Sequence, residues 1–449
     1  MLPKGSGPLE ILNSLSWTIA SFALVLGIMI FVHELGHYMM AKHLGIRVEV
    51  FSLGFGPRLF GFRKGDTDYR VSALPLGGYV RMKGENYEEE LSGDPDEFLS
   101  RPKTHRFAVA IAGPAMNLFL AVGLLAANYV MGVEVPVYLS EPAIVGHVAA
   151  ESPAEEAGFQ VKDQILAVNS QDTPTWEDFY LAVGTSPNES LTITLRRQNQ
   201  TLRKVVQATE EDLSGLGLIG VSPPVTNVIT ALVEGPAKDG GIEVGDEIVQ
   251  VEAGDLIVRD LQEILDLIAS REGKPVEFLL RRGDELLAKT IYPVEMDDQV
   301  RIGVAISPAF PRETKIEQYG VLEAIGRATQ RCYQLSELTF RLVGKLLTGT
   351  TSIKSMSGPI EIAKYSGRAA AEGVTALMGF MSLISLQLGI FNLFPIPILD
   401  GGVIALLAIE GAMRRDLSLK AKERIFQVGF LFLVLLMSIV IFNDISKNI

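Results

Sequence analysis

The sequence predicts a polytopic α-helical membrane protein with four transmembrane helices, a β-rich segment and two external α+β domains. The chain has 449 residues, 48% of them hydrophobic, and a mean hydropathy of +0.27. Four stretches approach the roughly 20 apolar residues that a membrane-crossing helix needs. The 40 basic and 53 acidic residues require polar domains as well, and the net charge of −13 argues against nucleic-acid binding. The four stretches run approximately over Leu15–Met40, Phe107–Met131, Thr375–Phe394 and Phe426–Phe442.

The first apolar stretch is expected to be a membrane span, with a cleaved signal peptide as the alternative. Lys4 is the only basic residue before it, no A-x-A site follows, and the apolar run leads directly into charged residues. Lysines and arginines are enriched in short cytoplasmic loops. Residues 43–105 and 403–425 are rich in both. We therefore expect these segments in the cytoplasm, with both termini and residues 133–374 outside.

The external region contains an internal repeat. Residues 151–169 and 234–252 are identical at eight of nineteen positions. Each copy has a helix start rich in small residues, a glycine turn and an alternating strand-like run. The strand-like runs Leu191–Arg196 and Val276–Arg281 follow them. Shared positions include Pro153/Pro236, Gly158/Gly241, Asp163/Asp246 and Ile165/Ile248.

The pattern S-P-A-x-x-A-G-x-x-x-x-D-x-I of this repeat resembles PDZ domains, which implies one domain at 133–215 and a second at 216–308. PDZ domains typically bind an extended peptide, such as a protein C-terminus, at a sheet edge. A size filter that binds no peptide is an equal alternative. Lys162 stands where the second copy has Gly245, which leaves the turn of the first copy open.

The chemistry-bearing motif lies in the first span. His33-Glu34-Leu35-Gly36-His37 is an H-E-x-x-H pattern that follows the apolar run FALVLGIMIFV. Positions four apart share one helix face, so both imidazoles can reach one metal ion while Glu34 contacts a water on it. Ionisable residues inside a membrane span are costly and usually functional. A zinc site is therefore expected, with two histidines hydrogen-bonded inside a helix bundle as the alternative. The single cysteine, Cys332, excludes a Cys-based zinc site and an intrachain disulfide.

Two histidines leave a catalytic zinc site one protein ligand short. Asp400 is the only ionisable residue between Glu372 and Glu410, and it lies in the segment NLFPIPILDGG. The prolines and glycines of this segment break a helix, which is tolerated at membrane depth where the chain lines a polar cavity. At 1.5 Å per residue, His33 lies about 27 Å along the first span and Asp400 just past a similar depth, so both are expected near the cytoplasmic side of the roughly 30 Å hydrocarbon core. A shared metal ion is geometrically reasonable; a helix end capped by Asp400 is the alternative.

HELGH, NLFPIPILDGG and the external repeats together resemble the bacterial site-2 protease family. The resemblance extends from Phe31 to the fourth span and includes LGGYVRM at 76–82, GPAMN at 113–117 and SGPIEIAK at 357–364. It implies an intramembrane zinc endopeptidase of the bacterial inner membrane. Its substrates would be single-span membrane proteins, such as an anti-sigma factor or remnant signal peptides, within an envelope stress response. It also implies zinc bound by His33, His37 and Asp400, with Glu34 as the catalytic glutamate.

Substrate contacts are expected from two further segments. Asn392, two turns before Asp400, is expected to donate to the substrate backbone or the developing oxyanion, with a structural amide as the alternative. Pro397 of the same motif is also expected to contact substrate. Residues 46–82 resemble the membrane-associated β-hairpin region of the family. Its edge, at Gly54 and Gly56, is expected to pair with an unwound substrate, with an ordinary cytoplasmic sheet as the alternative.

Two other classes of function make different predictions. A membrane-tethered PDZ scaffold or chaperone that has lost its chemistry predicts a broken metal site, and a transporter predicts polar residues along a path and repeated membrane halves. The sequence shows neither pattern. The expected order is a tail and first span at 1–42, a β region at 43–105, the second span at 106–132, PDZ domains at 133–215 and 216–308, amphipathic surface helices at 309–372, the third span at 373–402, a cytoplasmic loop at 403–425, the fourth span at 426–443 and a tail at 444–449.

Overall fold

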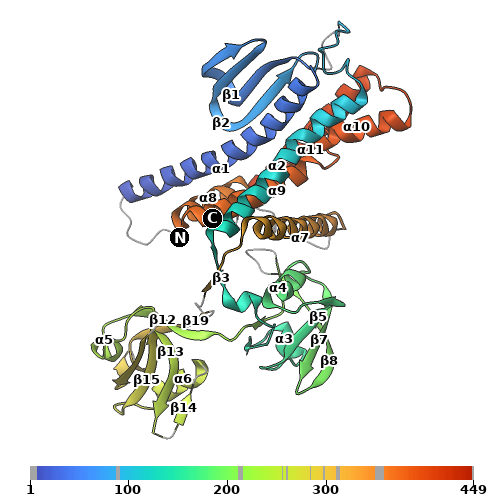
Figure 1. Cartoon of the computed structure of the whole chain (residues 1–449). Coiled ribbons are helices and arrows are strands. Elements are labelled where there is room, and N and C mark those ends of the chain that lie inside the picture. The colour runs from blue at the N-terminus through green and yellow to red at the C-terminus, as the bar shows by residue number, and fades with distance from the viewer. Residues whose placement is uncertain are drawn as a thin grey trace. The chain divides into compact units, whose positions relative to one another are not determined.

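The computed structural model consists of two compact units (Figure 1). The second unit comprises Val135–Glu211 and Leu216–Lys315, and the first unit contains the helices on either side of this region in the sequence. Lys4 and Lys447, which contributed to the predicted orientation, lie outside the described residues. The structure describes residues 8–86, 92–210, 216–254, 256–258, 261–283, 285–296, 299–309, 314–348 and 358–446.

The first unit is a helix bundle. Among the described residues, four helices are long and apolar enough to cross a membrane, which confirms the four predicted spans. These are α1, α2, α9 and α11. Helix α2 packs against both α1 and α9 (Figure 1). The helices run over Pro8–His43 (α1), Lys103–Met131 (α2), Val321–Thr348 (α7), Pro359–Glu372 (α8), Val374–Asn392 (α9), Asp400–Ala412 (α10) and Leu419–Ser446 (α11).

Small and polar side chains hold α1 and α9 close to α2. A Cβ atom on Gly36 of α1 would lie 2.4 Å from the Ala112 carbonyl oxygen, so this crossing needs a glycine, as is common between membrane helices. Ser385 of α9 donates its hydroxyl hydrogen bond to the Asn117 carbonyl oxygen at 2.8 Å. The equivalent bond from Ser382 to Ala121 measures 2.7 Å. Helix α2 therefore fixes the helices that carry both predicted motifs.

The third predicted span ends earlier than expected and is followed by a separate helix. Helix α9 ends at Asn392, and α10 begins at Asp400. Proline has no amide hydrogen with which to continue a helix, so the two prolines between them end α9. The chain then folds back so closely that a Cβ on Gly401 would lie 2.3 Å from the Leu393 carbonyl oxygen. Within the expected cytoplasmic loop at 403–425, the apolar residues up to Ala412 belong to α10, and the location of this segment stays a prediction.

The β region consists of two long strands, β1 (Val48–Lys64) and β2 (Thr67–Met82). Residues 50–53 of β1 pair with residues 78–81 of β2 on one side and with residues 68–71 on the other. In the described pairings, residues 78–82 have a neighbour on one side only and form an edge. The far part of β1 exposes the apolar side chains Phe55, Leu59, Phe60 and Phe62.

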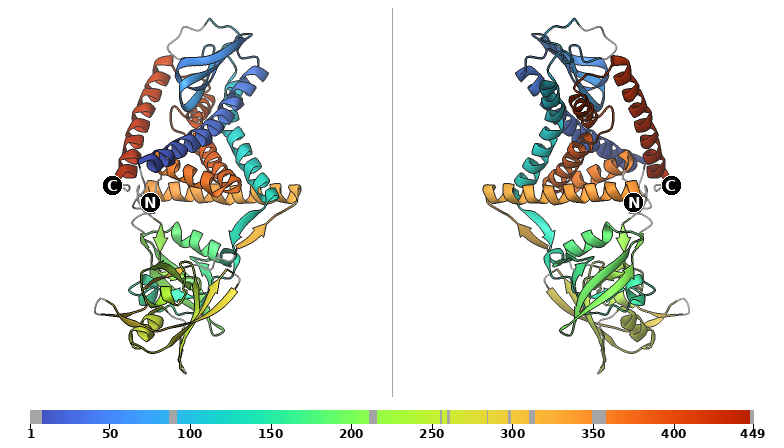
Figure 2. Two further views of the ribbon diagram at one scale, coloured as in Figure 1. Left: turned by 90° about the vertical axis from the view of Figure 1, so that its left-hand side faces the viewer. Right: turned by 90° about the vertical axis from the view of Figure 1, so that its right-hand side faces the viewer.

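Helix α7 runs across the ends of the other helices of the first unit (Figure 2). Its small residues Ala324 and Ala328 are fully buried and pack near Ala126 of α2. Cys332 of this helix is also buried and forms no disulfide. Within residues 309–372, where helices were expected, α7 and α8 are helical, whereas Thr314–Glu317 form a strand. The location of these helices at a membrane surface stays a prediction.

The second unit contains one larger sheet for each copy of the repeat, together with the two-stranded pairs β4–β11, β9–β10 and β17–β18. The first sheet has the order β6-β5-β7-β8, and the second has the order β16-β15-β13-β12-β19, with β14 paired to β13. The first set of elements is β4 (His147–Val148), α3 (Pro153–Glu156), β5 (Gln164–Val168), β6 (Gln171–Asp172), α4 (Trp176–Gly184), β7 (Ser190–Arg197), β8 (Gln200–Gln207), β9 (Thr209–Glu210), β10 (Gly217–Leu218) and β11 (Val221–Ser222). The second set is β12 (Thr226–Leu232), α5 (Pro236–Asp239), β13 (Glu247–Ala253), β14 (Leu256–Val258), α6 (Leu261–Ala269), β15 (Val276–Arg282), β16 (Glu285–Ile291), β17 (Val294–Met296), β18 (Gln299–Arg301) and β19 (Val304–Ala309). The short elements β3 (Val133–Pro136), η1 (Val137–Ser140) and β20 (Thr314–Glu317) complete the chain, and β3 pairs with β20.

The two copies share the same buried ion pair. Arg197 binds both carboxylate oxygens of Asp163, each at 2.7 Å. In the second copy Arg282 binds Asp246 in the same two-pronged way, at 2.7 and 2.8 Å. Each arginine also donates to the carbonyl oxygen of the repeat glycine, Gly158 or Gly241. The repeat found in the sequence is therefore a structural repeat.

The turn at Lys162 matches the one at Gly245 despite the different residue. Lys162 has a φ of 76° and Gly245 a φ of 98°. Their amides donate to the carbonyl oxygens of Val145 and Ile229, at 2.7 and 2.8 Å. A lysine accepts this left-handed conformation at a cost of about 1–2 kcal/mol. The substitution therefore leaves the geometry of the turn unchanged.

Candidate metal centre

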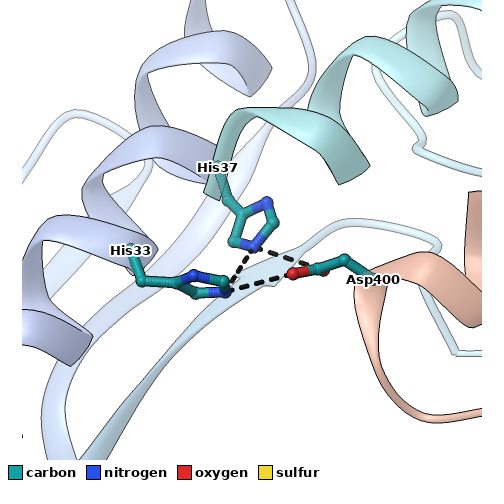
Figure 3. Close-up of side chains that lie close together, drawn as sticks. All are labelled: His33, His37 and Asp400. Carbon is teal, nitrogen blue, oxygen red and sulfur yellow. Dashed lines mark hydrogen bonds and ion pairs between the residues drawn. The ribbon is translucent and has the colours of Figure 1, made fainter. Parts of the chain in front are cut away.

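His33, His37 and Asp400 come together at one point of the first unit (Figure 3). The histidines lie one turn apart on α1 and are buried, and Asp400 is the first residue of α10. His33 Nε2 lies 3.1 Å from Asp400 Oδ2, and His37 Nε2 lies 3.3 Å from Asp400 Oδ1. The two Nε2 atoms are 3.2 Å apart. Two elements far apart in the sequence thus supply three candidate ligand atoms, as the sequence predicted.

The spacing of the two imidazole nitrogens and the Asp400 carboxylate fits ligands of one zinc ion. With metal–ligand bonds of about 2.0–2.1 Å, neighbouring ligand atoms of a tetrahedral zinc lie roughly 3.3 Å apart. The 3.2 Å between the two Nε2 atoms agrees with this value, and each Nε2 atom has one of the two Asp400 oxygens at 3.1 or 3.3 Å. Two imidazole nitrogens and one carboxylate oxygen are ligands that zinc accepts, and three protein ligands leave a fourth position open, as in catalytic sites. The residues present therefore suit a catalytic zinc ion.

Helix α2 shapes the space around the two imidazoles. His37 Nδ1 lies 2.8 Å from the Val109 carbonyl oxygen. This acceptor requires a proton on Nδ1 and leaves the Nε2 lone pair free for a metal. One turn further along α2, a Cβ on Gly113 would lie 2.3 Å from His37 Nε2 and 2.9 Å from His33 Nε2. The absence of a side chain at Gly113 is what leaves room for both rings.

Glu34 lies on the same turn of α1 and lines the cavity that contains the three ligand atoms. Strand β2 passes directly beside it: the ideal Cβ position of Gly78 is 3.3 Å from Glu34 Cγ. The main chain at Val80 is a hydrogen-bond partner of the Glu34 carboxylate. The carboxylate is thus held next to the metal site by the edge segment of the β region.

The cavity has a volume of about 480 Å³, within the usual range of ligand pockets. Asn392 lines it, as predicted for a substrate-contacting residue. Pro397, Gly54 and Gly56 are not among the described residues that line it. Pro397 instead packs against Gly429 of α11, and Gly54 lies against the main chain of Leu74. The lining residues are His33, Glu34, His37, Tyr79, Val80, Met82, Glu85, Asn86, Phe98, Val109, Ala110, Asn392, Ile398, Leu399, Asp400, Val403 and Phe426.

Sequence reasoning missed Glu85, which adds a third carboxylate to this cavity beside Glu34 and Asp400. Its side chain accepts a hydrogen bond from the Met82 amide at 3.0 Å. Burial raises the pKa of Glu85 to about 7, although the Met82 hydrogen bond acts in the opposite direction. The only signal in the sequence was its position three residues after the LGGYVRM segment. That position does not reveal that the strand leads into the cavity.

Comparison with known proteins agrees with this site. The model of peptidase family M50 matches residues 21–436. The chain is 34% identical to the regulator of sigma-E protease of Escherichia coli strain K12, over 97% of this chain and 99% of that protein. It is 31% identical to a Vibrio cholerae protein described as a zinc metalloprotease, over 97% of this chain and 100% of that protein. It is 32% identical to the regulator of sigma E protease of Salmonella typhi, over 97% and 99% of the two chains. The chain therefore belongs to peptidase family M50, the site-2 protease family, and is a zinc-dependent metalloprotease.

Proposed function

We propose that this membrane protein cleaves peptide bonds inside the bilayer, with zinc held by His33, His37 and Asp400 and with Glu34 as the catalytic residue. The observation that carries the proposal is a cluster beside Glu34: two Nε2 atoms 3.2 Å apart, and an Asp400 carboxylate whose two oxygens lie 3.1 and 3.3 Å from them. The two histidines lie in a helix that is long and apolar enough to cross a membrane. Charged groups in such a location are costly unless they serve a function.

The chemistry follows from the positions of these side chains. A zinc ion held there would make a water acidic and polarise the scissile carbonyl group. The Glu34 carboxylate takes the proton of the attacking water and later delivers it to the leaving nitrogen. The Asn392 side-chain amide, which also lines the cavity, donates to the substrate backbone or to the developing oxyanion. Pro397 keeps the chain broken so that Asn392 and Asp400 stay on the same side of the cavity.

The substrate is a single-span membrane protein that becomes extended before it is cut. A helical peptide hides its peptide bonds, whereas an extended one can add to a sheet edge. Residues 78–82 form such an edge and include Tyr79, Val80 and Met82 of the cavity lining. This edge lines the cavity that contains Glu34 and the candidate zinc ligands, whereas Gly54 and Gly56 do not. Exposed apolar residues of β1 provide contact with the bilayer.

The biological setting that we propose is the bacterial inner membrane. Relatives named regulator of sigma-E protease support an anti-sigma factor as substrate, in an envelope stress response. Remnant signal peptides are a second substrate class. The two repeats of the second unit are PDZ domains at 133–215 and 216–308, outside the membrane together with both termini. They bind the C-terminus of a peptide or exclude large substrates.

The test is cleavage of a model single-span substrate by the full chain in nanodiscs, together with measurement of bound zinc. We expect Glu34→Gln to lower the cleavage rate by about 10²- to 10⁴-fold while bound zinc stays stoichiometric. Asp400→Ala should lose both zinc and cleavage. Asp416→Ala is the matched control, since Asp416 is an exposed aspartate that pairs with Lys103 outside the cavity. Unchanged cleavage by Glu34→Gln would refute the proposed mechanism, and full zinc content in Asp400→Ala would refute the third ligand.

A further inference from the structure

One face of α2 presents three residues to the two imidazoles at intervals of one helical turn. Val109 offers its carbonyl oxygen to His37, Gly113 leaves space between the rings, and Asn117 places its side chain against His33. We propose that Asn117 is the positioning residue of His33, because it accepts a hydrogen bond from Nδ1–H and thereby directs Nε2 towards the metal. The proposal rests on the ligand set of the proposed function.

The surroundings of Asn117 limit what its side chain can do. The residue is fully buried, and its amide Nδ2 lies 3.2 Å from His33 Nδ1. Its Oδ1 atom has no hydrogen-bond partner in the part of the chain that the structure describes. Buried polar atoms nearly always have partners. Asn117 Oδ1 is such an unpaired atom, and its amide group faces a candidate metal ligand. We therefore infer that the amide acts on His33.

Which ring nitrogen of His33 carries the proton decides whether His33 Nδ1 pairs with the oxygen or with the NH₂ group of the Asn117 amide. A neutral imidazole has one N–H donor and one lone-pair acceptor. When Nε2 binds a metal, its lone pair is used and the proton sits on Nδ1. Two donors, Nδ1–H and the Asn117 NH₂ group, would then face each other. A 180° rotation of the Asn117 amide group exchanges its oxygen and nitrogen, two atoms that only the hydrogen-bond network distinguishes. This rotation brings the unpaired Asn117 Oδ1 to His33 Nδ1.

The two ligand histidines then have equivalent support. Metal-ligating histidines almost always donate their second ring nitrogen to a carboxylate, a carbonyl or a water, which fixes the ring orientation. For His37 this acceptor is the Val109 carbonyl oxygen at 2.8 Å. For His33 it is the Asn117 side chain. The position of Asn117 is itself fixed, because its main-chain carbonyl oxygen accepts a hydrogen bond from Ser385 of α9 at 2.8 Å.

The alternative role for Asn117 is a buried amide that only joins α1 to α2. Substitution distinguishes the two roles, because a positioning residue has to be an acceptor and a packing residue only has to fill the same volume. Asn117→Leu keeps the approximate volume without an acceptor. Asn117→Asp keeps the shape and offers acceptor oxygens alone, as in the carboxylate–histidine–zinc arrangement. Asn117→Ala tests the same loss without the bulk of a leucine.

Asn128 provides a matched control on the same helix. It is also buried, and its Nδ2 donates across a helix interface, to the Thr375 carbonyl oxygen at 3.0 Å. It lies three turns beyond Asn117 and does not line the metal cavity. Asn128→Leu therefore reproduces the loss of a buried inter-helix hydrogen bond without touching a ligand.

The experiment measures the Zn²⁺ affinity of the full chain in detergent by competition with a chromophoric chelator, with thermal unfolding of the metal-free protein recorded in parallel. Loss of such a supporting contact typically weakens metal binding about 10- to 100-fold. We expect this loss for Asn117→Leu and Asn117→Ala, an affinity within about threefold of the parent for Asn117→Asp, and no change for Asn128→Leu.

Parent-like affinity in Asn117→Leu or Asn117→Ala would overturn the inference, and so would an Asn117→Asp variant as weak as Asn117→Leu. An equal loss in Asn128→Leu would show that helix packing, not His33, is responsible. His33→Ala separates this inference from the ligand assignment. If His33→Ala retains full zinc affinity, the ligand set of the proposed function is wrong; if His33→Ala loses zinc and Asn117→Leu does not, only the role of Asn117 is wrong.

Discussion

A single methyl group on α2 should destroy the metal site. In Gly113→Ala the new Cβ atom would lie 2.3 Å from His37 Nε2, 2.6 Å from His37 Cε1 and 2.9 Å from His33 Nε2. Ordinary van der Waals contact begins near 3.4 Å. The His37 ring would thus have to move by about 1.1 Å and the His33 ring by about 0.5 Å, if the helices keep their positions. Zinc–ligand distances tolerate deviations of only about 0.2 Å.

The surrounding structure prevents an easy escape from this clash. His37 is held from behind by the Val109 carbonyl oxygen, and α1 already touches the α2 main chain at Gly36. Over-packing of this kind costs about 1–3 kcal/mol of stability. Because the displaced atoms are the ligand atoms themselves, zinc affinity should fall by at least about 100-fold, the upper end of the loss caused by removing a supporting contact.

The matched control is the same substitution on the same helix. A Cβ on Gly123 meets no atom within 4 Å. Gly123→Ala should therefore leave zinc affinity unchanged and, because glycine weakens a helix interior, raise stability by about 0.5–1 kcal/mol. The assay is chelator competition for Zn²⁺ and thermal unfolding of the full chain in detergent. Parent-like zinc affinity in Gly113→Ala would refute the steric reasoning. An equal loss of zinc affinity in Gly123→Ala would show that any added methyl group on α2 has this effect.

Two further predictions concern buried ion pairs. Lys422 Nζ lies 2.7 Å from Glu410 Oε1, and both side chains are almost fully buried. Lys422→Met should lower the free energy of unfolding by about 3–5 kcal/mol, because it leaves a buried carboxylate without its positive partner. The double variant Lys422→Met/Glu410→Gln should recover much of this loss in denaturant unfolding, and a double variant no more stable than the single one would contradict the explanation. In the second sheet, burial acts to raise the pKa of Asp246, but hydrogen bonds and charge from Arg282 outweigh it and hold the pKa below its usual range. This pair therefore stabilises the fold above the unfolded-state value of about 3.9, and the stabilisation disappears as the pH falls through the lower folded-state pKa. Hydrogen exchange should show weaker protection of β13 and β15 in Arg282→Met than in the parent at pH 6, and this difference should shrink as the pH falls below about 3.9. A difference that does not shrink would contradict the linkage.

Local properties of the chain were predictable. Hydrophobic runs identified the four helices that can cross a membrane, because a span depends only on about 20 successive apolar residues. The repeat and its shared aspartates were visible because both copies use the same turn and the same ion pair. Proline chemistry located the break after Asn392. The new helix beyond the break was not predicted, because its start depends on the chain folding back over Gly401.

The site was predictable in part. His33 and His37 share a helix face through their spacing, and Asp400 was the only ionisable residue in its region. The contributions of β2 and Glu85 were not predictable. The substrate-pairing edge was predicted at Gly54 and Gly56, because glycines interrupt the strand there. The edge beside Glu34 is instead formed by residues 78–82, which no periodicity distinguishes from the rest of the hairpin.

The sequence by itself determined which residues can bind zinc and on which apolar helices they lie, because ligand type, spacing and hydrophobicity are local. Only the tertiary structure decided what surrounds them. The rotation and closeness of α2 place Val109, Gly113 and Asn117 against the two imidazoles, and this depends on contacts at Gly36 and Ser385 with distant parts of the chain. Such inter-helix contacts are set by packing and not by the pattern of any one segment, so the support of the metal site became visible only in three dimensions.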